Sequence, residues 1–216
     1  MITIIDSGIA NIGSVVAAYR RLGVATTTTT HPKTVATAKA LILPGVGAFA
    51  DGMESLRQKD LVQPILDAAA AGVPILGICL GMQLLAEVSE EFGEHQGLGL
   101  IPGCVIPLQP TQVNERVPNI GWCDVSLNPQ SPLFHGMNTP QIFYFVHSYY
   151  LNCSDPLHAI ATTPFGNAKV TAAVAHRNIF GVQFHPEKSQ DTGLQLLNNF
   201  ARNIAPLAGV PDITVV

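Results

Sequence analysis

The sequence predicts an α/β fold with a mostly parallel central sheet flanked by helices and additional antiparallel strands in the second half. Three observations lead to this prediction. Hydrophobic residues make up 47% of the 216-residue chain and charged residues only 12%, which is typical of a globular protein with a large core. Apolar runs alternate with helix-like segments in the first half. Strand-like segments follow one another in the second half.

The first half alternates apolar strands with helices. The predicted strands are residues 2–5, 41–43 and 74–78. None of them has a polar face, which is typical of parallel strands buried on both sides. The first predicted helix runs through Leu22 and ends at Gly23, and apolar spacing predicts another helix over residues 80–87.

The second half contains short strands separated by turns, which favours antiparallel pairing. The predicted strands are residues 104–108, 122–127, 142–146, 159–163, 170–176 and 179–184. A closing helix is predicted over residues 190–204. The sequence has no internal repeat and no low-complexity linker, so we predict a single domain over residues 1–205 and a loose tail over 206–216.

Charge and composition exclude several classes of partner. The net charge of −4 is mild and the chain has no run of Lys and Arg, so we expect neither nucleic acid nor an anionic membrane as a partner. Residues 68–86 carry no charge, but four glycines and prolines divide them into a helix end, a turn, a buried strand and a new helix. We therefore predict no membrane span there.

The four cysteines are scattered without CxxC pairs, which favours neither a zinc site nor a disulfide framework. The N-terminal apolar run has no basic segment ahead of it and does not resemble a signal peptide. We expect a protein of the reducing cytoplasm, without a metal or other cofactor.

Cys79 lies in the segment Gly77-Ile78-Cys79-Leu80-Gly81, between a predicted strand and a predicted helix. Flanking glycines allow the tight strand-to-helix turn that exposes a nucleophile, as in Gly-x-Ser-x-Gly hydrolases. A helix N-terminus favours the thiolate, and the N–H of Leu80 is free to bind an oxyanion. A lone cysteine among apolar residues is commonly a small buried hydrophobe. The glycines favour the catalytic interpretation for Cys79 alone.

His185 and Glu187 supply the partners that such a thiol needs. In an extended segment, residues two apart point to the same face, so Glu187 can orient the imidazole while His185 exchanges a proton with Cys79. The same His-x-Glu pair occurs in zinc deaminases, but the chain lacks their Pro-Cys-x-x-Cys segment. His147 is more ambiguous, because a histidine at a strand end is usually a hydrogen-bonded structural residue.

The loop Pro44-Gly45-Val46-Gly47 follows another predicted strand. It lacks the Lys and Ser/Thr of a phosphate-binding loop, so nucleotide binding is not expected. The sequence leaves two interpretations open: an ordinary tight turn, or a flexible segment whose backbone N–H supplies a second oxyanion donor.

Together, residues 77–83 and 184–187 resemble the triad-type (class I) glutamine amidotransferases. Four further motifs resemble one group within that family, the glutaminase subunits of imidazole glycerol phosphate synthases: Met82, residues 118–122, residues 144–149 and residues 181–189. The resemblance covers nearly the whole chain and implies a flavodoxin-like fold.

The resemblance also implies site residues. Cys79 would attack the carboxamide of glutamine, with His185 as acid and base and Glu187 as its orienting partner. The N–H groups of Leu80 and Val46 would bind the oxyanion. Glutamine would be held by the following residues: Gly45, Gly47, Gln83, Glu91, Ser148 and Tyr149.

The implied partner is a cyclase subunit with a (β/α)8 barrel, which receives the ammonia. The residues that would meet it are Asn11, Trp122, Tyr144 and Lys188. Because ammonia released into neutral water becomes protonated, it has to travel through a dry passage between the subunits. We further expect the N–H of Val46 to face away from the site until the loaded partner binds.

Two other interpretations are weaker. Glutaminases of anthranilate or aminodeoxychorismate synthases usually carry His where this chain has Met82, and they differ after His-Pro-Glu, where this chain has Lys188-Ser189. A catalytically silent binding subunit would not need Cys79, His185 and Glu187 together.

Overall fold

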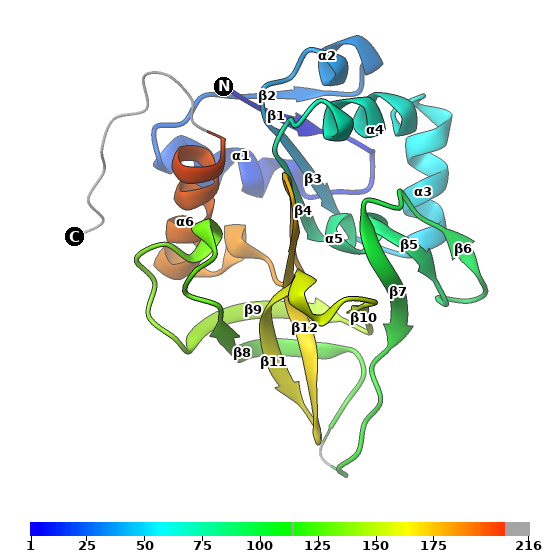
Figure 1. Cartoon of the computed structure of the whole chain (residues 1–216), viewed down its shortest axis with the longest axis vertical. Coiled ribbons are helices and arrows are strands. Elements are labelled where there is room, and N and C mark those ends of the chain that lie inside the picture. Colours follow the sequence, from blue (N-terminus) through cyan, green and yellow to red (C-terminus); the bar gives the residue numbers. More distant parts are fainter. Residues whose placement is uncertain (114, 206–216) are drawn as a thin grey trace.

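The computed structural model describes residues 1–113 and 115–205. Nine strands form its main sheet: β1 Ile2–Ile5, β2 Thr26–Thr29, β3 Leu41–Gly45, β4 Ile75–Cys79, β8 Asn119–Leu127, β9 Gln141–His147, β11 Ala159–Phe165, β12 Ala168–His176 and β13 Ile179–Val182. Their spatial order is β2-β1-β3-β4-β13-β12-β11-β8-β9 (Figure 1). The first five are parallel and the remaining pairs are antiparallel.

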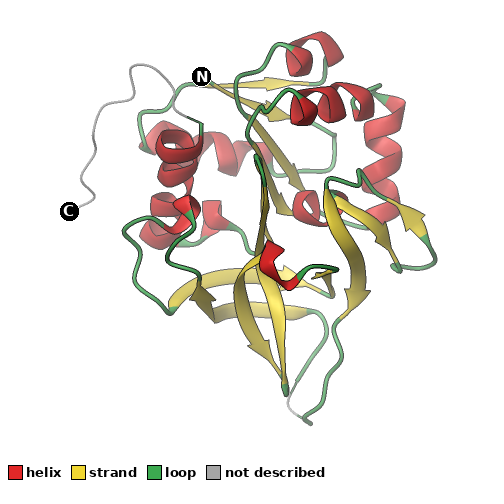
Figure 2. Cartoon of the chain, viewed as in Figure 1, coloured by secondary structure: helices red, strands yellow, loops and turns green. Residues whose placement is uncertain are grey.

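A second, four-stranded sheet lies beside the first, in the order β10-β7-β5-β6. Its strands are β5 Ala86–Ser89, β6 His95–Gln96, β7 Ile101–Pro107 and β10 Tyr149–Cys153. Strands β8, β9, β11 and β12 lie in the lower part of the view in Figure 2, whereas most helices surround the parallel strands in the upper part. The chain therefore has a helix-covered parallel region and a strand-rich antiparallel region.

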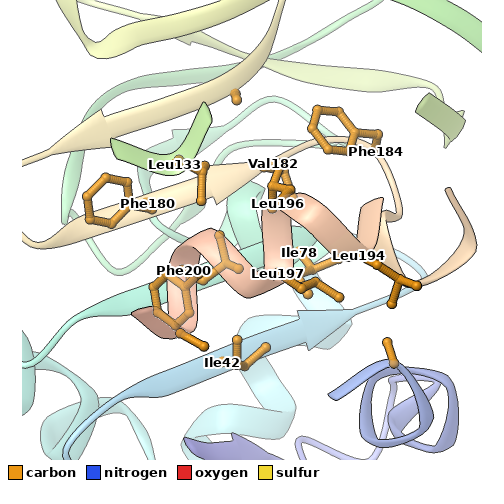
Figure 3. Packing of buried hydrophobic residues seen from close by; sticks show 14 of the residues in the cluster. Ile42, Ile78, Leu133, Phe180, Val182, Phe184, Leu194, Leu196, Leu197 and Phe200 are labelled. Atoms are coloured by element: carbon orange, nitrogen blue, oxygen red, sulfur yellow. The ribbon is translucent and has the colours of Figure 1, made fainter. Parts of the chain in front are cut away.

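Helices cover both faces of the parallel region. They are α1 Ile12–Arg21, α2 Pro32–Ala36, α3 Phe49–Gln58, α4 Val62–Ala70, α5 Leu80–Leu84 and α6 Gln190–Asn199. Side chains of α1 and α6 share one buried cluster with Ile42 and Ile78, and Figure 3 shows α6 residues packed there. Side chains of α3 and α4 share a second cluster with Leu41 and Leu43. Neighbouring residues of β3 thus point into opposite cores, which explains why the strand has no polar face.

The order of the parallel strands decides where a site can form. In the doubly wound order 2-1-3-4-5, the order in which strands are added reverses between the first and third strands, and ligands bind at that point, beyond the carboxyl ends of the strands. Here β1 is followed by residues 6–11, β3 by residues 46–48, β4 by α5 and β13 by residues 183–185. All four connections leave the same end of the sheet.

Several predictions are confirmed, with altered bounds. Every predicted strand is present, and residues 68–86 form a helix end, a turn, β4 and a new helix, as expected. Within the described residues, no helix combines the length and apolar character needed to cross a membrane.

Two helix predictions need correction. The helix predicted over residues 80–87 ends at Leu84, because the chain turns into β5, where Ala86 pairs with Ile101 of β7. The closing helix is α-helical only to Asn199 and continues as a π-helix over Phe200–Ile204. The sequence analysis did not predict β2, β5, β6 or β10. Residues 206–216, the predicted tail, lie outside the described residues, and the single-domain prediction stays a prediction.

Candidate active site

Cys79 occupies a strained turn at the junction of β4 and α5. Its backbone has φ 55° and ψ −113°, in the left-handed half of φ space that residues with a side chain rarely adopt. Such a conformation costs about 1–3 kcal/mol and is kept only where the surrounding packing enforces it. The geometry is that of a nucleophile turn, which turns the side chain out of the sheet.

Tight packing explains the glycines on either side of Cys79. A Cβ on Gly77 would lie 2.6 Å from the carbonyl oxygen of Gly81, and one on Gly81 would lie 1.7 Å from that of Leu43. Any side chain at these positions would push α5 away from β3 and β4. The predicted role of the two glycines is therefore explained by close approach of the backbone rather than by their own φ angles.

His185 follows β13 and is held by Glu187 in the short 3-10 helix η3, Pro186–Lys188. Its Nδ1 lies 2.8 Å from Oε1 of Glu187, and both side chains are buried. With Nδ1 engaged, Nε2 is the ring nitrogen left for the thiol. β13 pairs in parallel with β4, and Val182 aligns with Ile78, so the two strand ends bring His185 to Cys79.

The charge state of His185 reflects two opposing causes. Burial alone would lower the pKa of the imidazole. Hydrogen bonds with Cys79 and Glu187, together with their negative charge, outweigh burial and raise the pKa to about 9. The ring is therefore placed to hold the proton that the thiol gives up, with the sulfur on one side and the carboxylate of Glu187 on the other.

A cavity of about 260 Å³ opens above the sulfur. Most predicted site residues line it: Val46, Gly47, Cys79, Leu80, Gln83, Glu91, Ser148, Tyr149, His185 and Lys188. Glu91 is fixed by the N–H of Phe49, which donates to Oε2 at 2.5 Å. Glu187 lies behind His185, and Gly45 is packed against Leu80 beneath the cavity floor.

The loop after β3 is held by a backbone hydrogen bond to the loop after β1. The N–H of Val46 donates to the carbonyl oxygen of Ile9 at 2.8 Å, so it points to the loop after β1. That loop is itself anchored to α3, because Nζ of Lys59 donates to the carbonyl oxygen of Ser7 at 2.9 Å and Ser55 also hydrogen-bonds to it. In this arrangement the Val46 N–H is already occupied, whereas Leu80 begins α5 and its N–H has no partner within the helix.

Asn119 and Gln183 lie near the cavity and were not singled out in the sequence, whereas His147 was considered there as a hydrogen-bonded structural residue. Nδ1 of His147 donates to the carbonyl oxygen of Tyr149 at 2.9 Å, and Nε2 lies 3.2 Å from Nδ2 of Asn119. Burial lowers the pKa of His147 to about 4, so the ring stays neutral. Gln183 is completely buried and lies beside both Gln83 and the sulfur. Asn119 and Gln183 lie within residues 118–122 and 181–189, whose motifs carry the family resemblance, but nothing in their spacing indicated a role.

The predicted partner residues lie outside the cavity, except Lys188. The rings of Trp122 and Tyr144 meet edge to face with centroids 5.7 Å apart on β8 and β9, and the indole is half exposed. Lys188 is exposed on η3. Asn11 is exposed at the start of α1, a helix that packs against η3.

Comparison with known proteins decides the family. The sequence model of the family described as glutamine amidotransferase class-I matches residues 3–204. The chain belongs to the class I glutamine amidotransferase family. This confirms the resemblance predicted from the motifs around Cys79 and His185.

Relatives of this amidotransferase carry a more specific name. A protein of Sulfurimonas denitrificans is 47% identical over 204 residues, 94% of this chain and 98% of the relative. A protein of Lactococcus lactis is 46% identical over 94% of this chain and 98% of the relative. Both are called imidazole glycerol phosphate synthase subunit HisH.

Solved structures confirm the amidotransferase fold. A crystal structure described as glutamine amidotransferase superposes with a TM-score of 0.73 at 17% identity, covering 95% of this chain and 99% of that one. The structure of PurLQS from Thermotoga maritima gives 0.73 at 18% identity, covering 92% and 95%. At these identities the likeness concerns the fold alone.

Proposed function

We propose that this chain is the glutaminase subunit of an imidazole glycerol phosphate synthase. It hydrolyses glutamine to glutamate and ammonia and passes the ammonia to a cyclase subunit in histidine biosynthesis. The observation that carries the proposal is the buried Glu187–His185 pair, hydrogen-bonded to the sulfur of a strained Cys79 at the base of a cavity. Relatives with that name, 46–47% identical over 94% of the chain, support the pathway.

The chemistry is acyl transfer through a thioester. The proton of Cys79 Sγ moves to Nε2 of His185, and the thiolate attacks the carboxamide carbon of glutamine. The oxyanion that forms is bound by the N–H of Leu80. His185 then gives its proton to the leaving nitrogen, and ammonia departs. Water attacks the thioester with His185 as base, which releases glutamate and restores the thiol.

The cavity residues hold the amino-acid end of the substrate. The Glu91 carboxylate is placed to pair with the α-ammonium of glutamine, and Ser148 and Tyr149 offer polar groups to its carboxylate. Backbone groups of Gly45 and Gly47 complete this set. The side chain of Gln83 faces the same cavity, with Oε1 as its remaining acceptor because its amide nitrogen is already engaged.

The free chain is held in a state of low activity. The second oxyanion donor, the Val46 N–H, is tied to Ile9, and its release requires the peptide to rotate. Asn11 lies two residues after Ile9 on the face assigned to the partner. Binding of the loaded cyclase there would shift the loop after β1, free the N–H and complete the oxyanion hole. One missing donor of this kind costs on the order of 2.7–4 kcal/mol.

The partner is a (β/α)8-barrel cyclase that forms a heterodimer with this chain. It joins ammonia to a phosphoribulosyl-formimino carboxamide ribotide and yields imidazole glycerol phosphate and an aminoimidazole carboxamide ribotide. The exposed pair Trp122–Tyr144 supplies an aromatic contact for the barrel, with Lys188 and Asn11 at its sides. A closed interface keeps the ammonia unprotonated.

Two experiments test this proposal. The chain should co-purify with the barrel cyclase of its own organism. Cys79→Ala should abolish glutamine-dependent synthesis by the complex and leave synthesis from added ammonium salt unchanged. Loss of the ammonium-dependent reaction as well would make Cys79 a structural residue. Retained glutamine-dependent activity would exclude it as the nucleophile.

A further inference from the structure

A continuous chain of polar groups, partly buried at β8 and fully buried at its inner end, leads from β8 to the sulfur of Cys79. Its members are Asn119, His147, the carbonyl oxygen of Tyr149, Gln83 and Gln183. Gln183 is fully buried and Gln83 is 6% exposed, so water does not satisfy their amides. Buried amides of this kind are kept only where each donor and acceptor has a partner.

The direction of the hydrogen bonds follows from one fixed point. A backbone carbonyl can only accept, so the group that Gln83 turns to the oxygen of Tyr149 at 3.0 Å is its NH₂. The same nitrogen lies 3.0 Å from Oε1 of Gln183 and donates its second hydrogen there. Turning either amide by 180° would oppose two donors or two acceptors.

The amide of Gln183 is therefore locked with its NH₂ toward Cys79. Its Nε2 lies 3.8 Å from Sγ, within the range of hydrogen bonds to sulfur. The other polar contacts of the sulfur are His185 and the carbonyl oxygen of Val146, 3.8 Å away. The Val146 carbonyl accepts from a thiol but repels a thiolate. Among the side chains that the structure describes, Gln183 is thus a neutral donor placed to stabilise the charged form of the sulfur.

We propose that Gln183 is a catalytic residue that stabilises the thiolate of Cys79 with an amide N–H, in a direction that Gln83 imposes. The inference rests on the proposed function, because it concerns the nucleophile of that reaction. When the proton passes from Sγ to Nε2 of His185, the negative charge left on sulfur strengthens the bond from Gln183, since hydrogen bonds to ions are stronger than neutral ones.

The proposal also links the substrate to the nucleophile. Gln83 lines the cavity, and its Nε2 donates to Tyr149 and Gln183, which leaves Oε1 as the atom of this amide that can accept from a ligand. A donor group of glutamine that binds Oε1 polarises the Gln83 amide and makes its N–H a stronger donor to Gln183. The N–H of Gln183 is strengthened in turn.

The test is the pH profile of alkylation of Cys79 by iodoacetamide, measured on the full chain. Gln183→Met keeps the size of the side chain and removes the donor. We expect its profile to move to higher pH by about one unit, with the rate at neutral pH reduced about tenfold. In the complex, kcat for glutamine should fall about tenfold while KM stays within about twofold.

Thr163→Val is the matched control. Thr163 on β11 is also completely buried, and its hydroxyl donates to the carbonyl oxygen of Asp124 at 2.8 Å, away from the sulfur. This variant loses an equally buried hydrogen bond and should keep the alkylation profile of the unaltered chain. If it shifts the profile as much as Gln183→Met, a general loss of packing explains both, and the proposal is overturned.

Two further measurements test the same contact without the Gln183→Met variant, in case that variant does not fold. Gln183→Glu still accepts from Gln83 but turns an acceptor to the sulfur, and its alkylation should be slower still. In the unaltered chain labelled with ¹⁵N-glutamine, one slowly exchanging side-chain amide should shift with pH, and the shift should vanish in Cys79→Ala. If Gln183→Glu is alkylated as fast as the unaltered chain and no side-chain amide shifts with pH, Gln183 does not donate to the sulfur.

The two proposals fail in different ways. If Cys79→Ala abolishes glutamine use but Gln183→Met leaves the pH profile in place, the glutaminase proposal stands and the role of Gln183 is wrong. If Cys79→Ala retains glutamine use, the nucleophile itself has been misassigned.

Discussion

The two sides of the Cys79 sulfur are built differently. On the side of proton transfer, His185 and Glu187 are buried, 2.8 Å apart and fixed at the end of a central strand. On the side of the oxyanion, the Val46 N–H is turned away and bonded to Ile9 in a loop at the surface. In the proposed mechanism, the proton-transfer side is complete in the free chain and the oxyanion side, which needs the Val46 N–H, is not.

The difference follows from the kind of group on each side. Side chains packed in a core have one arrangement, and moving them would open a void. A peptide between two glycines rotates at much lower cost, because Gly45 and Gly47 carry no Cβ and Gly47 already has φ +101°. We therefore expect the packed side to stay unchanged from one turnover to the next, and the glycine-flanked peptide to be the part that a partner can reorient.

The largest effect should come from disturbing the complete side. Glu187→Gln keeps the shape of the side chain and removes the charge that holds the imidazole, so kcat of the complex should fall by about 10²–10³-fold. Steady-state glutaminase assays measure this. The control is Glu54→Gln on the exposed face of α3, where Glu54 pairs with Arg57 and no loss is expected. An unchanged kcat in Glu187→Gln would show that the charge of Glu187 is not needed to orient His185.

The next effect concerns the incomplete side. Glutaminase turnover of the free chain should be lower than that of the complex with loaded cyclase by a few hundredfold, the cost of one missing oxyanion donor. The comparison is made at saturating glutamine for the unaltered chain with and without cyclase. Equal turnover would mean that the Val46 N–H is either already available or not used.

A third prediction concerns how the free energy of unfolding depends on pH through His147, which lies near the sulfur. His147 stays neutral down to pH about 4, whereas in the unfolded chain it binds a proton below about 6.5. Stability should therefore fall between pH 6.5 and 4, by on the order of 2–3 kcal/mol from this residue, and level off below. Urea unfolding at several pH values measures the slope. His147→Gln should flatten it, and His31→Gln, at an exposed position, should not.

The smallest effect concerns the partner face. Trp122→Ala should weaken binding of the cyclase by more than about 1 kcal/mol, because half-exposed aromatic side chains commonly anchor interfaces. Isothermal titration of the two subunits gives the dissociation constant. Leu157→Ala, at an exposed leucine outside the predicted face, serves as control. Identical constants for Trp122→Ala and the unaltered chain would remove the indole from the interface.

Much of the fold could be predicted from apolar patterning. The strands β1, β3 and β4 have no polar residue that must face water, and this alone indicates a sheet covered on both sides. β2 was missed because four consecutive threonines show no apolar run, although their β-branched side chains suit an edge strand. The helix from Leu80 was extended too far, since pairing of β5 with β7 is a tertiary effect.

The candidate site was predictable where its residues are close in sequence or lie at strand ends. Gly77 and Gly81 mark the turn at Cys79, and two-residue spacing joins His185 to Glu187. The hydrogen bond between Val46 and Ile9 joins only backbone atoms, which any sequence could supply, so no residue type could indicate it. Gln183 was invisible for a different reason: its role depends on a partner one hundred residues away.

The central place of β13 has a consequence for the growing polypeptide. This strand lies between β4 and β12, and it is among the last elements to be synthesised. A nascent chain that has reached β12 already contains the thiol but has no imidazole beside it. The proposed set of Cys79, His185 and Glu187 can therefore assemble only after nearly the whole polypeptide has been synthesised.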